Sequence, residues 1–187
     1  MKRLSETAQF TAPLSTSTHR LAQQFRHQHR NPQKAKQVYL NTLAVSAVEF
    51  YLRCMGVDTD WSISQSYDPI MQSLLDVADL DLPGKGKLEC RPLLETTTAT
   101  ALKIPLEICR DRIAHIAVQL APSLQEATLL GFVPANCEEI VLDQLRSLDD
   151  LADYLNQIQP TSYRVNLSNW LENLFETGWQ SLTALTG

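Results

Sequence analysis

The sequence predicts an α+β fold, in which a long buried central helix packs on a mainly antiparallel β-sheet of about four or five strands, with helices toward the C-terminal end. One observation behind this prediction is a long and almost uniformly apolar helical pattern over residues 31–56. The other is a series of apolar or alternating segments at about 77–82, 87–93, 112–120 and 126–133. A layered domain needs one element to cover its sheet, and residues 31–56 are the longest and most apolar candidate.

The central helix is predicted from its end signals and its composition. Asn31 can act as the N-cap, and Gly56 suits the position after the helix because glycine tolerates a positive φ. Between residues 38 and 55 only Glu49 and Arg53 are charged, and they are four residues apart in the favourable order. A helix that is apolar nearly all round is buried, and the polar residues that interrupt the run disfavour a membrane span.

The clearest β pattern covers residues 77–94. Apolar residues alternate with Asp79 and Asp81, which predicts one apolar face and one solvated acidic face. The segment from Pro83 to Gly86 has turn composition, and Leu88 and Cys90 resume the alternation on a return strand. The turn lacks the GxxxxGK[ST] spacing of a phosphate-binding loop, so we interpret it as a hairpin turn.

The later part of the chain supplies the other elements. The apolar runs 112–120 and 126–133 are expected to be antiparallel neighbours, and short strands are expected near 101–104 and 140–142. Ser147 is expected to cap a helix that Pro160 ends, and residues 166–187 are expected to form a terminal amphipathic helix.

The domain organisation is expected to be simple. Residues 1–17 are rich in Ser and Thr and show no period, which predicts a flexible N-terminal lead-in; residues 18–187 are expected to form a single α+β domain. No apolar signal-peptide core is visible, so a cytoplasmic location is expected. The four cysteines form no CxxC pair, and each is expected to behave as a small core residue.

The charge distribution is asymmetric. Residues 1–40 contain seven Lys or Arg and one acidic residue, whereas residues 41–187 contain nine basic and twenty acidic residues. A basic arm on an acidic body can contact nucleic acid or a membrane, and it can equally lie on its own acidic body. The dilute spacing of the cations favours the second interpretation.

No catalytic, cofactor-binding or metal-binding motif is present, and we expect no site of these three kinds. An enzyme remains an alternative only if its site is assembled from scattered residues such as Cys109, Asp111 and His115. A lone histidine in an apolar strand is more often a hydrogen-bonded or edge residue than a ligand or a base.

The terminal helix carries the candidate partner-binding residues. Its apolar stripe contains two of the three tryptophans of the chain, and large aromatic side chains are typical anchors of protein interfaces. The residues expected to contact a partner are Trp170, Leu171, Leu174, Phe175 and Trp179.

Several long phrases of the chain resemble a known family. They are VYLNTLAVSAVEFYLRCMGVDTDW (38–61), DVADLDLPGKGKLECRPLL (76–94), DRIAHIAVQLAPSLQEATLLGFVP (111–134), SLDDLADYLNQ (147–157) and NLSNWLENLFETGW (166–179). In this order they resemble the cyanobacterial domain-of-unknown-function family eighteen-twenty-two. The resemblance implies no catalytic residue, because the family has no assigned activity. It also implies a regulatory partner role, because some members occur in gene neighbourhoods with sigma factors or caspase-like peptidases.

The sequence therefore predicts a non-enzymatic, cytoplasmic, protein-binding regulatory module. Its expected partner is a cytoplasmic protein such as a sigma factor or a caspase-like protease, with no membrane and no cofactor involved. The alternatives are an enzyme with a scattered site and a nucleic-acid-binding protein that uses the basic N-terminal arm.

Overall fold

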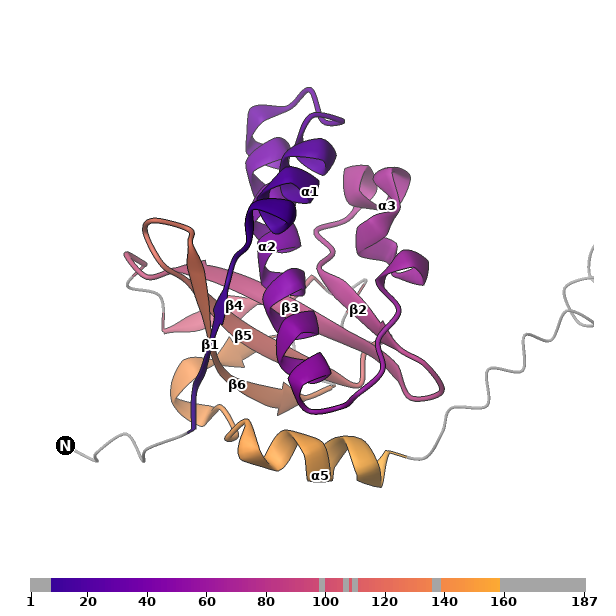
Figure 1. Cartoon of the computed structure of the whole chain (residues 1–187), viewed down its shortest axis with the longest axis vertical. Helices are drawn as coiled ribbons and strands as arrows, with labels where there is room; N and C mark the ends of the chain where they lie inside the picture. Colours follow the sequence, from indigo (N-terminus) through magenta and orange to yellow (C-terminus); the bar gives the residue numbers. More distant parts are fainter. Residues whose placement is uncertain (1–7, 98–99, 106–107, 109–110, 136–138, 159–187) are drawn as a thin grey trace, which may run out of the picture.

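The computed structural model describes residues 8–97, 100–105, 108, 111–135 and 139–158. It shows a mixed α/β domain built on a curled five-stranded sheet (Figure 1). The helices are α1 (Thr16–Arg26), α2 (Pro32–Cys54), α3 (Pro69–Leu74) and α5 (Asp149–Gln157), with short 3-10 turns η1 (Trp61–Ile63), η2 (Gln65–Tyr67) and η3 (Leu142–Gln144). The strands are β1 (Phe10–Pro13), β2 (Asp79–Leu82), β3 (Gly86–Leu94), β4 (Ala101–Lys103), β5 (Ala114–Leu120), β6 (Glu126–Pro134) and β7 (Glu139–Val141).

The main sheet has the strand order β1-β6-β5-β3-β2, and β4 pairs with β7 in a separate two-stranded sheet. The predicted hairpin is confirmed, since β2 and β3 are antiparallel and Leu82 pairs with Gly86 across the turn. The predicted antiparallel pairing of β5 and β6 is also confirmed. However, β3 and β5 run parallel, because the chain leaves the sheet after β3, passes through β4 and re-enters in the same direction.

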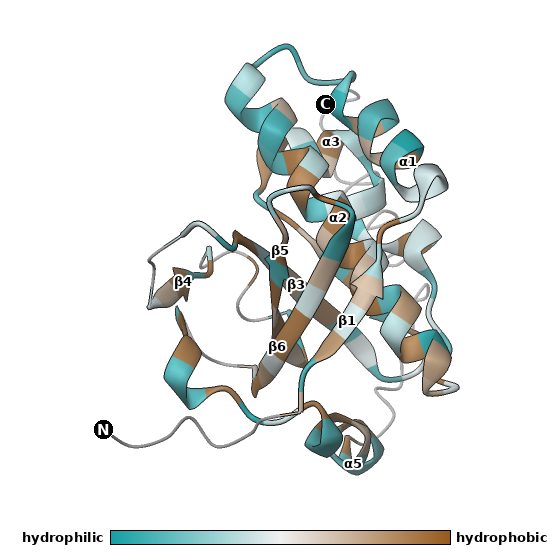
Figure 2. Cartoon of the chain, turned by 60° about the vertical axis from the view of Figure 1, so that its left-hand side comes forward, coloured by the Kyte–Doolittle hydropathy of each residue, from teal (hydrophilic) through white to brown (hydrophobic). Residues whose placement is uncertain are grey.

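Helix α2 begins and ends as its end signals predict. The Asn31 side chain accepts hydrogen bonds from the backbone N–H groups of Gln33 and Lys34, at 2.9 and 3.2 Å. Gly56 follows the helix with a φ of +73°. Figure 1 shows α2 crossing one face of the main sheet, and its middle residues are fully buried against that face. Its first turn remains exposed, and Figure 2 shows this end, like α1, largely in hydrophilic colours.

The fold begins earlier in the chain than expected. Strand β1 lies within the predicted lead-in and pairs with β6, which places Ala12 in the core with no exposed surface. Ser15 then caps α1 by accepting a hydrogen bond from the Thr18 N–H at 3.2 Å. A strand of four residues is too short to show a period in the sequence, and its position is determined by the open edge of β6. Residues 1–7 lie outside the described residues.

The core has two parts. The larger cluster lies between α2 and the sheet, and α5 closes its end through Leu151 and Leu155, while the Tyr51 hydroxyl donates to the Leu148 carbonyl at 3.1 Å. The smaller cluster covers the other face of the sheet with residues from β4 and β7. Ser147 caps α5 as expected, since its Oγ accepts a hydrogen bond from the Asp149 N–H at 3.3 Å, while Leu148 already has helical dihedral angles. The predicted terminal helix 166–187 lies outside the described residues. No described helix is both long and apolar enough to cross a lipid bilayer.

Gly131 is expected to be intolerant of substitution. It has a φ of +148°, and a Cβ added there would lie 2.5 Å from the backbone oxygen of Arg146, which pairs with the neighbouring Phe132. We expect Gly131→Ala to lower the free energy of unfolding by about 1–3 kcal/mol, measured by urea denaturation. Gly84→Ala is the matched control, because Gly84 has a φ of +75° but no atom within 4 Å of an added Cβ. Equal losses in the two variants would contradict the role of the close contact.

Candidate functional site

A buried ionic network lies on the sheet face that points away from α2. Asp79 of β2 and Glu89 of β3 are direct partners across the hairpin, and both side chains are fully buried. Two carboxylates placed opposite each other destabilise a sheet unless a cation compensates them. Arg112 supplies this charge: its Nε donates to Glu89 Oε2 at 2.9 Å, and its Nη2 lies 3.9 Å from Asp79 Oδ2.

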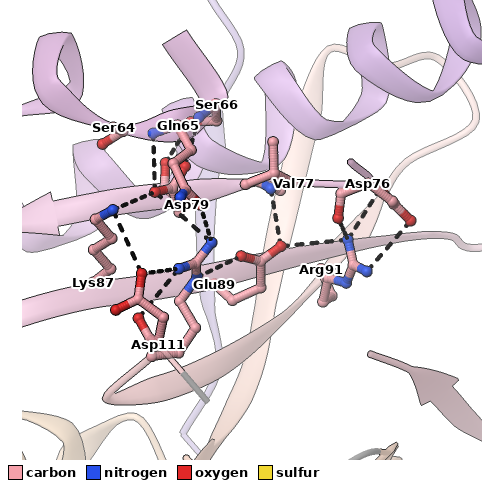
Figure 3. Close-up of polar contacts among 12 residues, drawn as sticks. Ser64, Gln65, Ser66, Asp76, Val77, Asp79, Lys87, Glu89, Arg91 and Asp111 are labelled. Carbon is pink, nitrogen blue, oxygen red and sulfur yellow. Dashed lines mark hydrogen bonds and ion pairs between the residues drawn. The ribbon is translucent and has the colours of Figure 1, made fainter. Parts of the chain in front are cut away.

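The segment from Asp60 to Tyr67 covers the acidic face of β2. The backbone N–H groups of Gln65 and Ser66 donate to the Asp79 carboxylate at 3.1 and 2.6 Å (Figure 3). The prediction that Asp79 and Asp81 form a solvated face is therefore wrong, because their exposed fractions are 0% and 7%. Alternation identifies the two faces of a strand but does not show whether another segment covers the polar one. Burial raises the pKa of Asp81 against the opposing effect of Lys87.

Glu89 is the centre of the network. Burial raises its pKa, and the charges of Arg91 and Arg112 oppose that shift. Its Oε1 accepts from the Ala78 N–H at 2.9 Å, and Arg91 Nη1 lies 3.4 Å from the same oxygen. A buried carboxylate that keeps so many partners is held rigidly, which fixes the relative position of β2 and β3.

The network reaches the surface at Asp76. Arg91 pairs with this carboxylate, with Nη1 at 3.1 Å from Oδ1 and Nη2 at 3.3 Å from Oδ2 (Figure 3). Asn41 of α2 donates from Nδ2 to Asp76 Oδ1 and to the Val77 carbonyl, both at 3.0 Å. This end of the network therefore connects the sheet to α2.

His115 lies beside the network. It is the β5 neighbour of Glu89, it has no exposed surface, and among the described residues neither its Nδ1 nor its Nε2 has a hydrogen-bond partner. Burial, together with the charges of Arg112 and Arg91, lowers the pKa of His115 to about 4. The expectation of a hydrogen-bonded or edge histidine is wrong, because β5 lies in the interior of the sheet between β6 and β3.

A second feature of the molecule is an exposed apolar surface, hereafter the 63–74 surface. It consists of Ile63, Tyr67, Ile70 and Leu74, which are 61%, 41%, 68% and 73% exposed. All four belong to the short η1–η2–α3 segment, in which they follow one another at intervals of four, three and four residues. Beneath it, Tyr67 packs edge-on against Phe25 with ring centroids 5.2 Å apart. Within the described residues, these are the large hydrophobic side chains that remain exposed.

A family model described as "Protein of unknown function (DUF1822)" matches residues 12–187. The chain belongs to the DUF1822 family. No curated protein and no solved structure matches this DUF1822 chain.

Most of the residues expected to form a partner-binding or catalytic site lie outside the described part of this DUF1822 chain, and the structure does not bring Asp111 and His115 together. The five residues of the predicted partner-binding stripe, Trp170, Leu171, Leu174, Phe175 and Trp179, lie outside the described residues, as does Cys109. Asp111 pairs with Arg112 at 3.2 Å and with Lys87 at 3.7 Å rather than with His115. Among the described residues no group of three or more His, Cys, Asp or Glu side chains is arranged to hold a metal ion.

The cysteines of the DUF1822 domain also differ from expectation. Cys90 is buried as expected, and burial raises the pKa of its thiol well above the usual value, which disfavours the reactive thiolate. Cys54 is exposed at the end of α2, so the prediction of a core residue is wrong there.

Sequence reasoning missed both features, although each left a signal. A tight turn centred on Gly84 pairs residue 79 with residue 89, so the predicted hairpin already implied two opposed carboxylates and a need for a cation. The 63–74 surface has helix-like spacing, but the segment is divided into three short pieces and no continuous helix pattern was visible.

Proposed function

We propose that this DUF1822 protein is a non-enzymatic, cytoplasmic regulatory module that binds a protein partner through the 63–74 surface. The observation that supports the proposal is the gathering of four large exposed apolar side chains on one segment. Isolated exposed apolar residues are normal on any protein, whereas a contiguous group marks an interaction site.

The charges of the same segment indicate the chemistry of the partner. Residues 57–76 contain Asp58, Asp60, Asp68 and Asp76 and no lysine or arginine. An apolar surface on an acidic segment is complementary to an apolar helix face flanked by basic residues. Basic DNA-binding proteins have this character, so a sigma factor is the first partner class to test, followed by a caspase-like protease.

The nucleic-acid alternative has less support. Two cations of the basic N-terminal arm contact the protein itself: Lys34 Nζ donates to the Leu75 carbonyl at 2.6 Å, and Arg26 lies over the Tyr39 ring at 5.9 Å from its centroid. Burial lowers the pKa of Lys34. Fewer free cations remain for phosphate contacts, which are the main source of nucleic-acid affinity.

The test has two stages. A photocrosslinking amino acid placed at Leu74 in living cells captures the partner, and the same amino acid at the exposed Gln24 of α1 provides the control. The affinity of the purified partner is then measured for the wild-type protein and for the variant Ile63→Ser/Ile70→Ser/Leu74→Ser. We expect at least a tenfold loss of affinity, because apolar anchors carry much of the energy of an interface.

Two controls accompany the affinity measurement. The exposed positions of these side chains should leave the unfolding midpoint of the triple variant close to the wild-type value. Gln24→Ser, which changes an exposed polar residue, should bind as the wild type does. An unchanged affinity in the folded triple variant, or a partner captured equally at Gln24, would reject the 63–74 surface as the binding site.

A further inference from the structure

A cavity of about 470 Å³ lies between the first half of α2, the strand β3 and the short strand β4. Its size is within the range of about 300–1,000 Å³ that is usual for small-molecule sites. It belongs neither to the 63–74 surface nor to the interior of the ionic network, although it shares Asp76 and Arg91 with that network.

The cavity carries more positive than negative charge. Lys36 of α2 and Lys103 of β4 line it from opposite elements, and both are exposed. Within the described part of the chain, neither lysine side chain has a hydrogen bond or an ion pair, and Lys103 is the cross-strand neighbour of Glu139 in β7. The other charged residues among the described lining are Arg91 and Asp76, which neutralise each other. The cavity therefore offers a ligand the two lysine side chains, of which Lys36 has no acidic residue paired opposite it and Lys103 has Glu139.

The polar wall of the cavity is held in position by the network. Arg91 is 5% exposed and is fixed by Asp76 and Glu89, and Asn41 is fixed by its bonds to Asp76 and Val77. Polar groups that are immobilised before a ligand arrives reduce the entropy cost of binding.

The remaining wall is apolar. Leu40, Pro92 and Leu102 line the cavity, and each is half-buried. Ligand sites commonly combine such apolar walls with a small number of placed polar or charged groups.

We propose that this cavity binds a small organic anion, in which a carboxylate or phosphate group contacts Lys36 and Lys103 and an apolar body contacts Leu40, Pro92 and Leu102. The anionic group has two cations on opposite walls within the same cavity, and the apolar body loses its contact with water. A cationic or purely polar ligand lacks one of these two interactions.

Titration of the full chain with defined probes, followed by amide NMR, tests the proposal. Hexanoate and phenyl phosphate present the two anionic groups on apolar bodies, and hexan-1-ol and benzyl alcohol are their neutral counterparts. We expect the anions to shift the amide signals of Asn41 and Leu102 and to bind at least tenfold more tightly than the alcohols. The stronger of the two anions identifies the ligand as a carboxylate or a phosphate.

The two lysines provide the matched variants. Lys36→Ala/Lys103→Ala is expected to weaken anion binding at least tenfold, whereas Arg20→Ala, which removes an exposed cation of α1, should change it less than twofold. Three results would each overturn the proposal: equal binding of the alcohols, unchanged anion binding in the lysine variant, or no shift at Asn41 and Leu102 at about 10 mM probe. A probe concentration of 10 mM is about the upper limit for a site whose binding free energy is a few kcal/mol.

Discussion

Replacing Arg112 by Met is expected to lower the free energy of unfolding by about 3–5 kcal/mol, which is the usual cost of removing one partner from a buried ion pair. The Arg112 side chain is fully buried, and it is the cation closest to Glu89, at 2.9 Å. Its removal leaves Glu89 and Asp79 directly opposite each other with weaker compensation, since Arg91 is 3.4 Å from Glu89 and Lys87 is 3.9 Å from Asp79. Urea denaturation at pH 7 measures the loss.

Two further variants separate charge from shape in this prediction. Arg112→Lys keeps a cation but loses the contact of the guanidinium with both Glu89 and Gln65, so an intermediate loss is expected. Adding Glu89→Gln to Arg112→Met removes the uncompensated charge and should restore part of the stability. A loss below about 1 kcal/mol for Arg112→Met would mean that the pair is solvated like a surface salt bridge.

Acid is expected to destabilise the protein through His115 by about 3 kcal/mol between pH 6.5 and pH 4, at about 1.4 kcal/mol per pH unit. The pKa of His115 is lowered from its ordinary value of 6.5 to about 4 in the folded protein. The unfolded chain therefore takes up a proton at His115 first as the pH falls. The contribution of neutral His115 to the free energy of unfolding is therefore fully present above pH 6.5 and is lost progressively as the pH approaches 4.

Other groups near His115 titrate in the opposite sense. The pKa of Glu89 is raised in the folded protein, so protonation of Glu89 favours the folded state as the pH falls. Glu89 is present in both the wild type and His115→Gln, so its contribution cancels when the two stability curves are compared. Because Gln does not titrate, the remaining difference is the contribution of His115. The wild type should lose about 3 kcal/mol more than the variant between pH 6.5 and 4. If the stability curves of the wild type and His115→Gln were parallel, the pKa of His115 would not be lowered by folding, and the ring would be protonated or hydrogen-bonded in the folded protein.

His115 also has a cost at neutral pH. Two buried ring nitrogens without partners are expected to destabilise the fold by about 1–3 kcal/mol relative to a satisfied site. Such groups are rare in native proteins and mark either a bound water or a functional role. For this reason His115 is the described residue on which the enzyme alternative depends most.

Much of the secondary structure was predictable because local chemistry determines it. Asn31 and Gly56 define the ends of α2, and the turn from Pro83 to Gly86 defines the β2–β3 hairpin. The strands β5 and β6 follow from their apolar runs. In each case the signal lies within a few residues of the element that it specifies. The tertiary contacts of these elements agree with that local preference.

The candidate sites were less predictable because they depend on contacts between distant segments. Whether Asp79 meets water or the backbone of Ser66 depends on the course of the chain from residue 60 to 67. The unpartnered state of His115 depends on strands β3 and β6 on either side of it. No periodicity within β2 or β5 contains this information.

The sequence alone determined the mixed α/β character, the ends of α2, the hairpin and the family of this protein. Only the tertiary structure decided that β3 and β5 are parallel, that β1 extends the sheet and that the acidic face of β2 is buried. It also decided that Lys36 and Lys103, which are far apart in the sequence, line the same cavity. The physical reason is the range of the interactions: caps, turns and alternation act between near neighbours, whereas burial and charge pairing depend on which distant segments the fold brings together.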